Sequence, residues 1–212
     1  MLEFTPGARR TLSLFLLLGI ITMTVMFKVE APLLLGMNPD WDRKVHAYRW
    51  LLHVHAVLGC VALFAAPAQY FPQLRRRHLQ AHRVLGRIYV GAVLISAPIG
   101  MYIALVHLRG SESDAAAVQA LAWLGTTLIA LSAAVGKRLA AHQCWMVRSY
   151  ALTFSFVISR FTVDVLNVEL SPVLGGNSGL IWACTCIALM MGTAWRYAAV
   201  PRTVSTAATV AE

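Results

Sequence analysis

The stretch YRWLLHVHAVLGCVALFAAPAQYF, residues 48–71, decides the fold class, because Arg49 is its only residue that is charged at every physiological pH. A helix that crosses the hydrocarbon core of a bilayer needs ~20 mostly apolar residues at a rise of ~1.5 Å each. Similar stretches occupy residues 10–28, 84–107, 117–135, 147–168 and 180–198. The sequence therefore predicts an all-α integral membrane bundle of about six transmembrane helices.

The composition of the whole chain agrees with a protein that lies in lipid. Hydrophobic residues make up 58% of its 212 residues, and charged residues only 13%. A transmembrane β-barrel would alternate apolar and polar residues over segments of ~10 residues, whereas these apolar runs are long and continuous. No long linker divides the chain, so we expect one domain over residues 1–202 and a short disordered tail over residues 203–212.

Lysine and arginine residues collect at alternate breaks between the apolar stretches, and this pattern predicts the orientation in the membrane. They include Arg75, Arg76, Arg77, Lys137 and Arg138. Short basic loops remain in the cytoplasm, so both termini are expected there. A cleaved signal peptide is the alternative for the first stretch, but the apolar run at residues 12–27 is longer than the usual signal core of ~7–15 residues.

The formal net charge of +9 does not indicate a nucleic-acid partner, because the charges flank membrane stretches and no basic domain with interleaved aromatic residues is present. Anionic lipid is the expected partner of Arg75, Arg76 and Arg77, at about 1 kcal/mol per basic residue. The four cysteines form no CxxC pair. Gly-rich phosphate loops, GxSxG and HExxH motifs are absent, so nucleotide, serine-hydrolase and zincin chemistries lack support.

Three histidines lie at the stretch ends that we assign to the cytoplasmic side. His78 and His82 are four residues apart, so on a helix they share a face about one turn apart. His142 precedes the fifth stretch at the same depth. Two helices that enter from one side can present imidazoles to each other, which is the arrangement of a bis-histidine haem. The alternative is that these residues, above all His78, are only interfacial polar groups.

A second polar group lies toward the opposite face. His53 and His55 are about 200° apart around a helix, so they cannot both face one ligand, and we favour His55. Arg160 and Asp164, in the fifth stretch, are spaced for an i,i+4 ion pair that offsets the cost of burying each charge. This pair is either functional or a structural bridge. His107 lies near the water boundary, where solvation is the simpler expectation.

The strings HVHAVLGCVALFAAPAQYFPQLRRRHLQAHRVLGRIYV and HQCWMVRSYALTFSFVISRF span roughly the second to fifth stretches. Their distinctive features are His55 with Gly59, Pro67 and Gln69; His82 and Arg83 with Gly86 and Tyr89; His142 with Trp145, Met146 and residues 148–151; and Arg160. These features resemble an uncharacterised bacterial family of predicted membrane proteins, the domain of unknown function 2306. The family has no established activity, so the resemblance implies only a multi-pass protein of the bacterial inner membrane.

Two functional interpretations remain. The first is a membrane electron-transfer protein, a possible oxidoreductase, that holds haem b between helices and exchanges electrons with a quinol or another small molecule. The second is a metal-ion or small-solute binding protein or transporter without redox chemistry, for which copper, zinc or iron is the candidate ion. The candidate cofactor and metal ligands are His55, His82 and His142, with Arg83 and Arg148 beside them, and the candidate polar-pocket residues are Arg160, Asp164, Gln69, His78 and His107.

Overall fold

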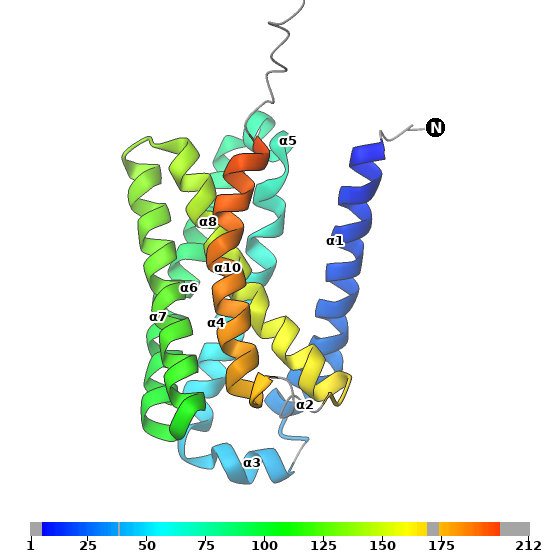
Figure 1. Cartoon of the computed structure of the whole chain (residues 1–212), viewed down its shortest axis with the longest axis vertical. Coiled ribbons are helices and arrows are strands. Elements are labelled where there is room, and N and C mark those ends of the chain that lie inside the picture. Colours follow the sequence, from blue (N-terminus) through cyan, green and yellow to red (C-terminus); the bar gives the residue numbers. More distant parts are fainter. Residues whose placement is uncertain (1–5, 38, 169–173, 200–212) are drawn as a thin grey trace, which may run out of the picture.

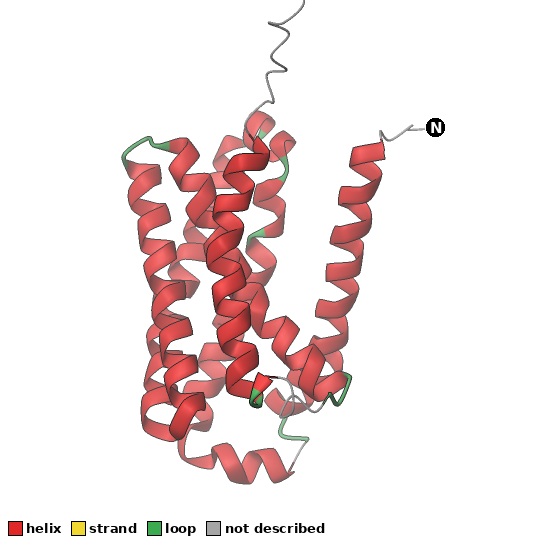
Figure 2. Cartoon of the chain, in the orientation of Figure 1, coloured by secondary structure: helices red, strands yellow, loops and turns green. Residues whose placement is uncertain are grey.

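The computed structural model describes residues 6–37, 39–168 and 174–199, and these ranges are almost entirely helical, with no strand (Figure 2). The longer helices are α1 (Pro6–Val25), α4 (Arg49–Ala65), α6 (Leu79–His107), α7 (Gly110–Val135), α8 (Leu139–Arg160) and α10 (Asn177–Ala199). Short helices are α2 (Ala31–Leu34), α3 (Pro39–Val45) and α5 (Pro72–Arg77). The π-helical segments η1 (Met26–Glu30) and η4 (Phe161–Val165) and the 3₁₀ segments η2 (His46–Tyr48) and η3 (Pro67–Tyr70) continue or join them.

The predicted all-α membrane bundle is confirmed. Within the described residues, five helical segments are long and apolar enough to cross a membrane: Leu16–Leu34, Arg43–Tyr70, Leu79–His107, Gly110–Val135 and Asn177–Ala194. Large apolar side chains such as Ile20, Trp50, Leu105 and Met190 are exposed on the outside of the bundle. Such a surface is suited to lipid, because a soluble protein rarely exposes apolar patches of this extent.

The predicted fifth stretch, residues 147–168, falls in α8 and η4 and is not among these five segments. The reason is its polar content, since Ser149, Thr153 and Ser155 are buried on α8 and Arg160 ends it. This helix nevertheless packs against both α7 and α10. Figure 1 shows that α8 runs obliquely across the bundle until η4 meets α1, a contact that the structure records.

Several helices begin earlier than the predicted stretches. The first residue of α6 is Leu79 rather than residue 84, that of α7 is Gly110 rather than residue 117, and that of α8 is Leu139 rather than residue 147. The polar residues of these first turns end the apolar pattern without ending the helix, because a helix can extend beyond the hydrocarbon core into the headgroup region. As a result His82 and His142 lie within helices.

The helices pack in a sequence of neighbours: α4 lies on α6, α6 on α7, α7 on α8 and α8 on α10. Their contacts are rich in small residues, including Ala62, Ala92 and Ala97, which let helix backbones approach closely. The buried side chains of Tyr89 and Trp123 fill the centre.

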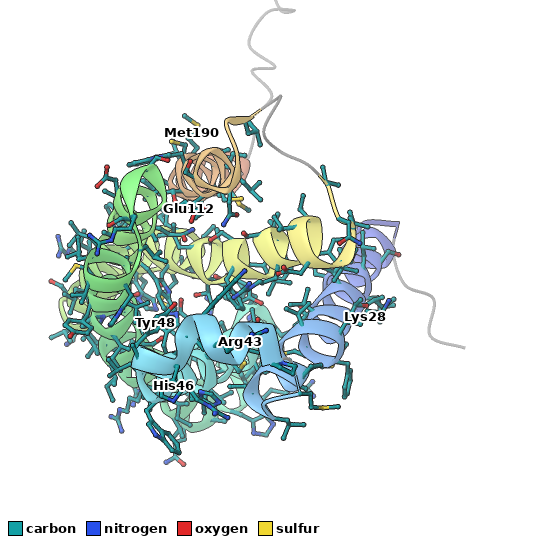
Figure 3. All side chains as sticks on the ribbon, turned by 90° about the horizontal axis from the view of Figure 1, so that it is seen from below. Lys28, Arg43, His46, Tyr48, Glu112 and Met190 are labelled. Atoms are coloured by element: carbon teal, nitrogen blue, oxygen red, sulfur yellow. The ribbon has the colours of Figure 1, made fainter. Side chains whose placement is uncertain are left out.

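The two ends of the bundle differ in their elements (Figure 1). One, here the α5 end, holds α5, the start of α1 and the end of α10, with exposed Arg75, Arg76 and Arg77. The other, the α3 end, is crossed by α3, as seen from below in Figure 3 with Arg43 and His46 labelled. Arg109 also lies at the α3 end, between α6 and α7, so basic residues are not confined to the α5 end. The predicted cytoplasmic location of both termini stays a prediction.

Candidate functional site

A cavity of about 160 Å³ lies inside the α3-end half of the bundle. Its walls are mostly apolar and come from η1, α2, α4, α6, α7 and α8. Polar groups reach it from Glu30, His55, Gln119, Thr153 and Arg160. A cavity of about 150 Å³ in a protein core is large enough for benzene, so this one admits a molecule about the size of one aromatic ring.

The ring of His55 is held at one side of this cavity by α6. Its Nδ1 atom lies 2.9 Å from the carbonyl oxygen of Ser96 and 3.0 Å from Ser96 Oγ, which donates in turn to the His55 carbonyl oxygen at 3.0 Å. A carbonyl oxygen only accepts, so Nδ1 carries the proton. In the neutral ring, the Nε2 atom of His55 is therefore an unprotonated base at the cavity.

Gly100 makes room for this imidazole. A Cβ atom at position 100 would lie 3.0 Å from His55 Nδ1 and only 2.7 Å from His55 Cε1, and the second distance is closer than real Cβ atoms approach other atoms. The ring thus lies directly against the backbone of α6, which also supplies its hydrogen-bond acceptor. Contacts on one helix fix both the position and the protonated nitrogen of the ring.

Three charged side chains lie together where η1 and η4 meet. Arg160 Nη1 lies 3.2 Å from Asp164 Oδ2, which is the predicted i,i+4 ion pair, and Arg160 Nε lies 3.5 Å from Glu30 Oε1. The Glu30 side chain is only 3% exposed, whereas that of Asp164 is 30% exposed. Glu30 is therefore the buried carboxylate of this ion cluster.

Sequence reasoning missed Glu30, because the first stretch was taken to end at residue 28. The apolar pattern continues beyond this acid through residues 31–35, so a buried charge within the span was the available signal. An acidic residue in a membrane segment is costly unless it is paired, and it marks a functional site by default.

Both sides of the ion cluster are attached to π-helical segments. Glu30 is the last residue of η1, and η4 begins directly after Arg160 and contains Asp164. A single π-helical turn inserts an extra residue and so changes the direction of the side chains that follow, and such turns are frequent at functional sites. Here Glu30 of η1 meets Arg160, the last residue of α8, and Asp164 of η4.

The other histidines of the α3 end face elsewhere. The two ring nitrogens of His53 lie 2.7 Å from the Arg49 carbonyl oxygen and 3.1 Å from the Leu34 carbonyl oxygen. His107 stacks on Tyr48 at 4.3 Å between ring centroids. Of the predicted candidates at this end, His55 and Arg160 share the cavity and His107 does not.

The histidines of the α5 end form a separate group on α6 and α8. His142 Nδ1 lies 2.9 Å from the Ala130 carbonyl oxygen and thus donates to it, which leaves Nε2 as a base. His82 Nδ1 is buried and has no hydrogen-bond partner among the described residues. The two rings are close enough to interact electrostatically. His78 precedes α6 and is exposed, so it does not share this position.

The remaining predicted residues make structural contacts. Arg148 donates from Nε to the Leu189 carbonyl oxygen at 2.8 Å and from Nη2 to Thr193 Oγ1 at 2.7 Å, which ties α8 to α10. Gln69 lies beside Gly86, where a Cβ atom would be 3.2 Å from the amide oxygen. Arg83 is exposed.

The three predicted ligands therefore lie in two places, His55 at the cavity and His82 with His142 near the α5 end. Within the ranges that the structure describes, no group of three or more histidine, cysteine, aspartate or glutamate side chains has the geometry to hold a metal ion. A site at either place would use one or two imidazoles together with other ligands.

Comparison with known proteins agrees with this architecture. A family model described as "Predicted membrane protein (DUF2306)" matches residues 52–195, from α4 to the last turns of α10. The match includes the cavity residues on α4, α6, α7 and α8 and both histidines of the α5 end. No curated protein and no solved structure matches the chain. The chain belongs to the DUF2306 family of predicted membrane proteins.

Proposed function

We propose that this protein binds a small organic molecule within the membrane, in the cavity around His55, as a binding protein or transporter. The observation that carries the proposal is an unprotonated Nε2 atom at an apolar cavity of about 160 Å³. The ligand has an apolar body of about one ring and a hydroxyl or amine group that donates to this nitrogen. A phenol or the ring of a quinol has this chemistry.

The lining supports an amphiphilic ligand of this kind. Leu33, Leu63, Leu152 and Phe156 are part of the wall, so an apolar body would gain about 25 cal/mol per Å² of surface removed from water. Glu30 and Arg160 neutralise each other at one side of the cavity. A ligand without net charge is therefore favoured over an ion.

Gln119 offers a second polar contact on α7. Its Nε2 atom donates to Ser155 Oγ at 2.7 Å, so its amide oxygen is left as an acceptor. Together with His55 Nε2, the cavity then presents acceptors from two helices, which suits a ligand with more than one donor. Orientation by a few convergent polar groups in an apolar pocket is the usual design of small-molecule sites.

Calorimetric titration of the purified protein with phenol tests the proposal. Gly59 lines the cavity and a Cβ atom there meets nothing within 4 Å, so Gly59→Leu places a side chain in the space without a backbone clash. We expect saturable phenol binding by the wild type and its loss in this variant. Gly91→Leu is the matched control, because Gly91 is exposed on α6, lies outside the cavity and also has open space around it. Equal binding by wild type and Gly59→Leu would contradict the proposal.

The histidines of the α5 end support a second candidate function, the binding of haem b or a transition metal such as copper, zinc or iron. The supporting observation is that His82 and His142 come from helices that both pack on α7 and are close enough to interact. The donation from His142 Nδ1 to a carbonyl is the outer contact that metal-bound histidines usually make. An absorption spectrum of protein expressed with haem available, together with elemental analysis, tests this. His82→Ala or His142→Ala should remove the bound group, and His78→Ala should retain it.

A further inference from the structure

Four buried hydroxyl groups form a hydrogen-bonded chain between α6, α7 and α8. Thr153 Oγ1 lies 3.0 Å from Tyr89 Oη, which lies 2.7 Å from Ser149 Oγ, which lies 2.7 Å from Thr127 Oγ1. Tyr89, Ser149 and Thr127 are 0% exposed and Thr153 is 6% exposed. We propose that this hydroxyl chain conducts protons between the cavity and the α5-end half of the membrane.

The four hydroxyl protons can be ordered in two ways, which supports conduction in either direction. Besides the three links, Thr127 Oγ1 has an acceptor at the Trp123 carbonyl oxygen, 2.7 Å away, and Thr153 Oγ1 has one at the Ser149 carbonyl oxygen, 3.1 Å away. The four hydroxyl protons can therefore all point toward Thr127 and end on the Trp123 carbonyl. They can equally all point toward Thr153 and end on the Ser149 carbonyl. Both orders satisfy every donor.

The transfer step balances in atoms and charge. In one concerted step, Thr153 takes up a proton from the cavity, each hydroxyl passes its own proton to the next oxygen, and Thr127 releases one proton toward the α5-end half, where the unprotonated Nε2 atom of His142 is the acceptor. The chain is then in the opposite order, with the same number of protons as before. Rotation of each hydroxyl about its C–O bond restores the first order, because both orders end on a carbonyl oxygen.

Both ends of the chain lie near groups that exchange protons. Thr153 lines the cavity that contains His55. At the other end, Thr127 is one helical turn before Ala130, whose carbonyl oxygen accepts from the His142 ring.

Two other buried hydroxyls, on Thr126 and Thr185, show what a purely local role looks like. Thr126 and Thr185 hydrogen-bond to carbonyl oxygens of their own helices, three or four residues back. Thr127 and Thr153 make the same kind of contact within their own helices, but the four members of the hydroxyl chain also bond to one another across helices. Such bonds also hold membrane helices together, so the test must separate proton transfer from packing.

Proton flux into proteoliposomes that contain a trapped pH-sensitive dye provides this test. A potassium diffusion potential set with valinomycin drives protons inward, and no other ligand is added. We expect wild-type protein to acidify the interior faster than protein-free vesicles do, and more slowly in D₂O. Thr127→Val and Tyr89→Phe, which keep side-chain shape but remove a link, should reduce the rate to that of protein-free vesicles, whereas Thr127→Ser should retain the wild-type rate.

Thr126→Val is the matched control, because Thr126 is the buried neighbour of Thr127 on the same helix and lies outside the hydroxyl chain. It should leave the rate unchanged. The proposal is overturned if wild type and protein-free vesicles acidify alike, if Thr127→Val and Tyr89→Phe acidify like wild type, or if Thr126→Val loses as much flux as Thr127→Val. Phenol binding is measured separately in detergent, so failure of one proposal leaves the other intact.

Discussion

The two ends of the bundle hold histidines in different electrostatic surroundings. At the α3 end, His55 shares a cavity with Glu30 and Arg160, a buried ion pair. At the α5 end, His82 and His142 lie close to each other, and the charged groups that act on His82 are arginines. All acidic side chains that the structure describes, on Glu30, Glu112, Asp114 and Asp164, belong to the α3-end half.

This difference indicates different chemistry at the two ends. At the α3 end the carboxylate of Glu30 is paired with Arg160, so the His55 imidazole lies beside an ion pair and a polar ligand without net charge is favoured there. Among the described residues, no carboxylate lies in the α5-end half with His82 and His142, and this setting suits imidazoles that act as metal ligands. The five predictions below probe this contrast, beginning with the largest effect.

Removal of the guanidinium at the α3 end should give the largest loss of stability. Arg160→Leu leaves the buried carboxylate of Glu30 without its cation, and breaking a buried ion pair costs about 3–5 kcal/mol. Thermal unfolding in detergent measures the loss. The double variant Arg160→Leu with Glu30→Gln should recover most of it, because no lone buried charge remains. A double variant as unstable as the single one would show that the charges are not coupled.

At the α5-end half, Arg148→Ala should also destabilise the bundle, by about 1.5–3 kcal/mol, since it removes two charge-assisted hydrogen bonds to α10. Phenol binding should be unchanged, because Arg148 does not line the cavity. Unfolding in detergent and calorimetry on the same preparation distinguish the two effects. Loss of phenol binding in Arg148→Ala would show that the contacts near the α5 end and the cavity at the α3 end are not independent.

The sequence predicted the all-α membrane fold well, because bilayer thickness imposes a length on every apolar stretch. It also predicted the Arg160 and Asp164 ion pair, since an i,i+4 spacing has a fixed geometry on a helix. The position of Glu30 within an apolar run was a signal in the sequence, but its contact with Arg160 could not be predicted, because it depends on how η1 packs against η4. The burial of Ser149 and Thr153 likewise depends on which helices pack against α8. The fifth predicted stretch, residues 147–168, is therefore a helix with buried polar residues at the centre of the bundle.

A smaller effect is expected where α6 contacts the imidazole. Gly100→Ala places a Cβ atom 2.7 Å from His55 Cε1, so the ring must shift, and overpacking of this kind costs about 1–3 kcal/mol. The same variant should weaken phenol binding. Gly91→Ala on the same helix is the control, because a Cβ atom there meets nothing within 4 Å. Equal unfolding temperatures and phenol affinities for the two variants would argue against a fixed ring.

The smallest effect should follow neutralisation of the outer acid. Asp164 is partly exposed, and ion pairs of that kind contribute about 0–1 kcal/mol. Asp164→Asn should therefore lower the unfolding temperature far less than Arg160→Leu does, and added salt should reduce the difference from wild type. If both variants lost the same stability, Asp164 rather than Glu30 would be the principal partner of Arg160.

The most direct test of the central claim, that His55 Nε2 is a base at a ligand-sized cavity, is the selectivity for phenol over toluene. Both rings fit the same space, but only phenol donates a hydrogen bond, which contributes about 0.5–1.5 kcal/mol. In His55→Asn, which keeps a donor near the Nδ1 position and loses Nε2, we predict that phenol affinity falls roughly two- to tenfold while toluene affinity stays the same. Unchanged selectivity in this variant would contradict the account.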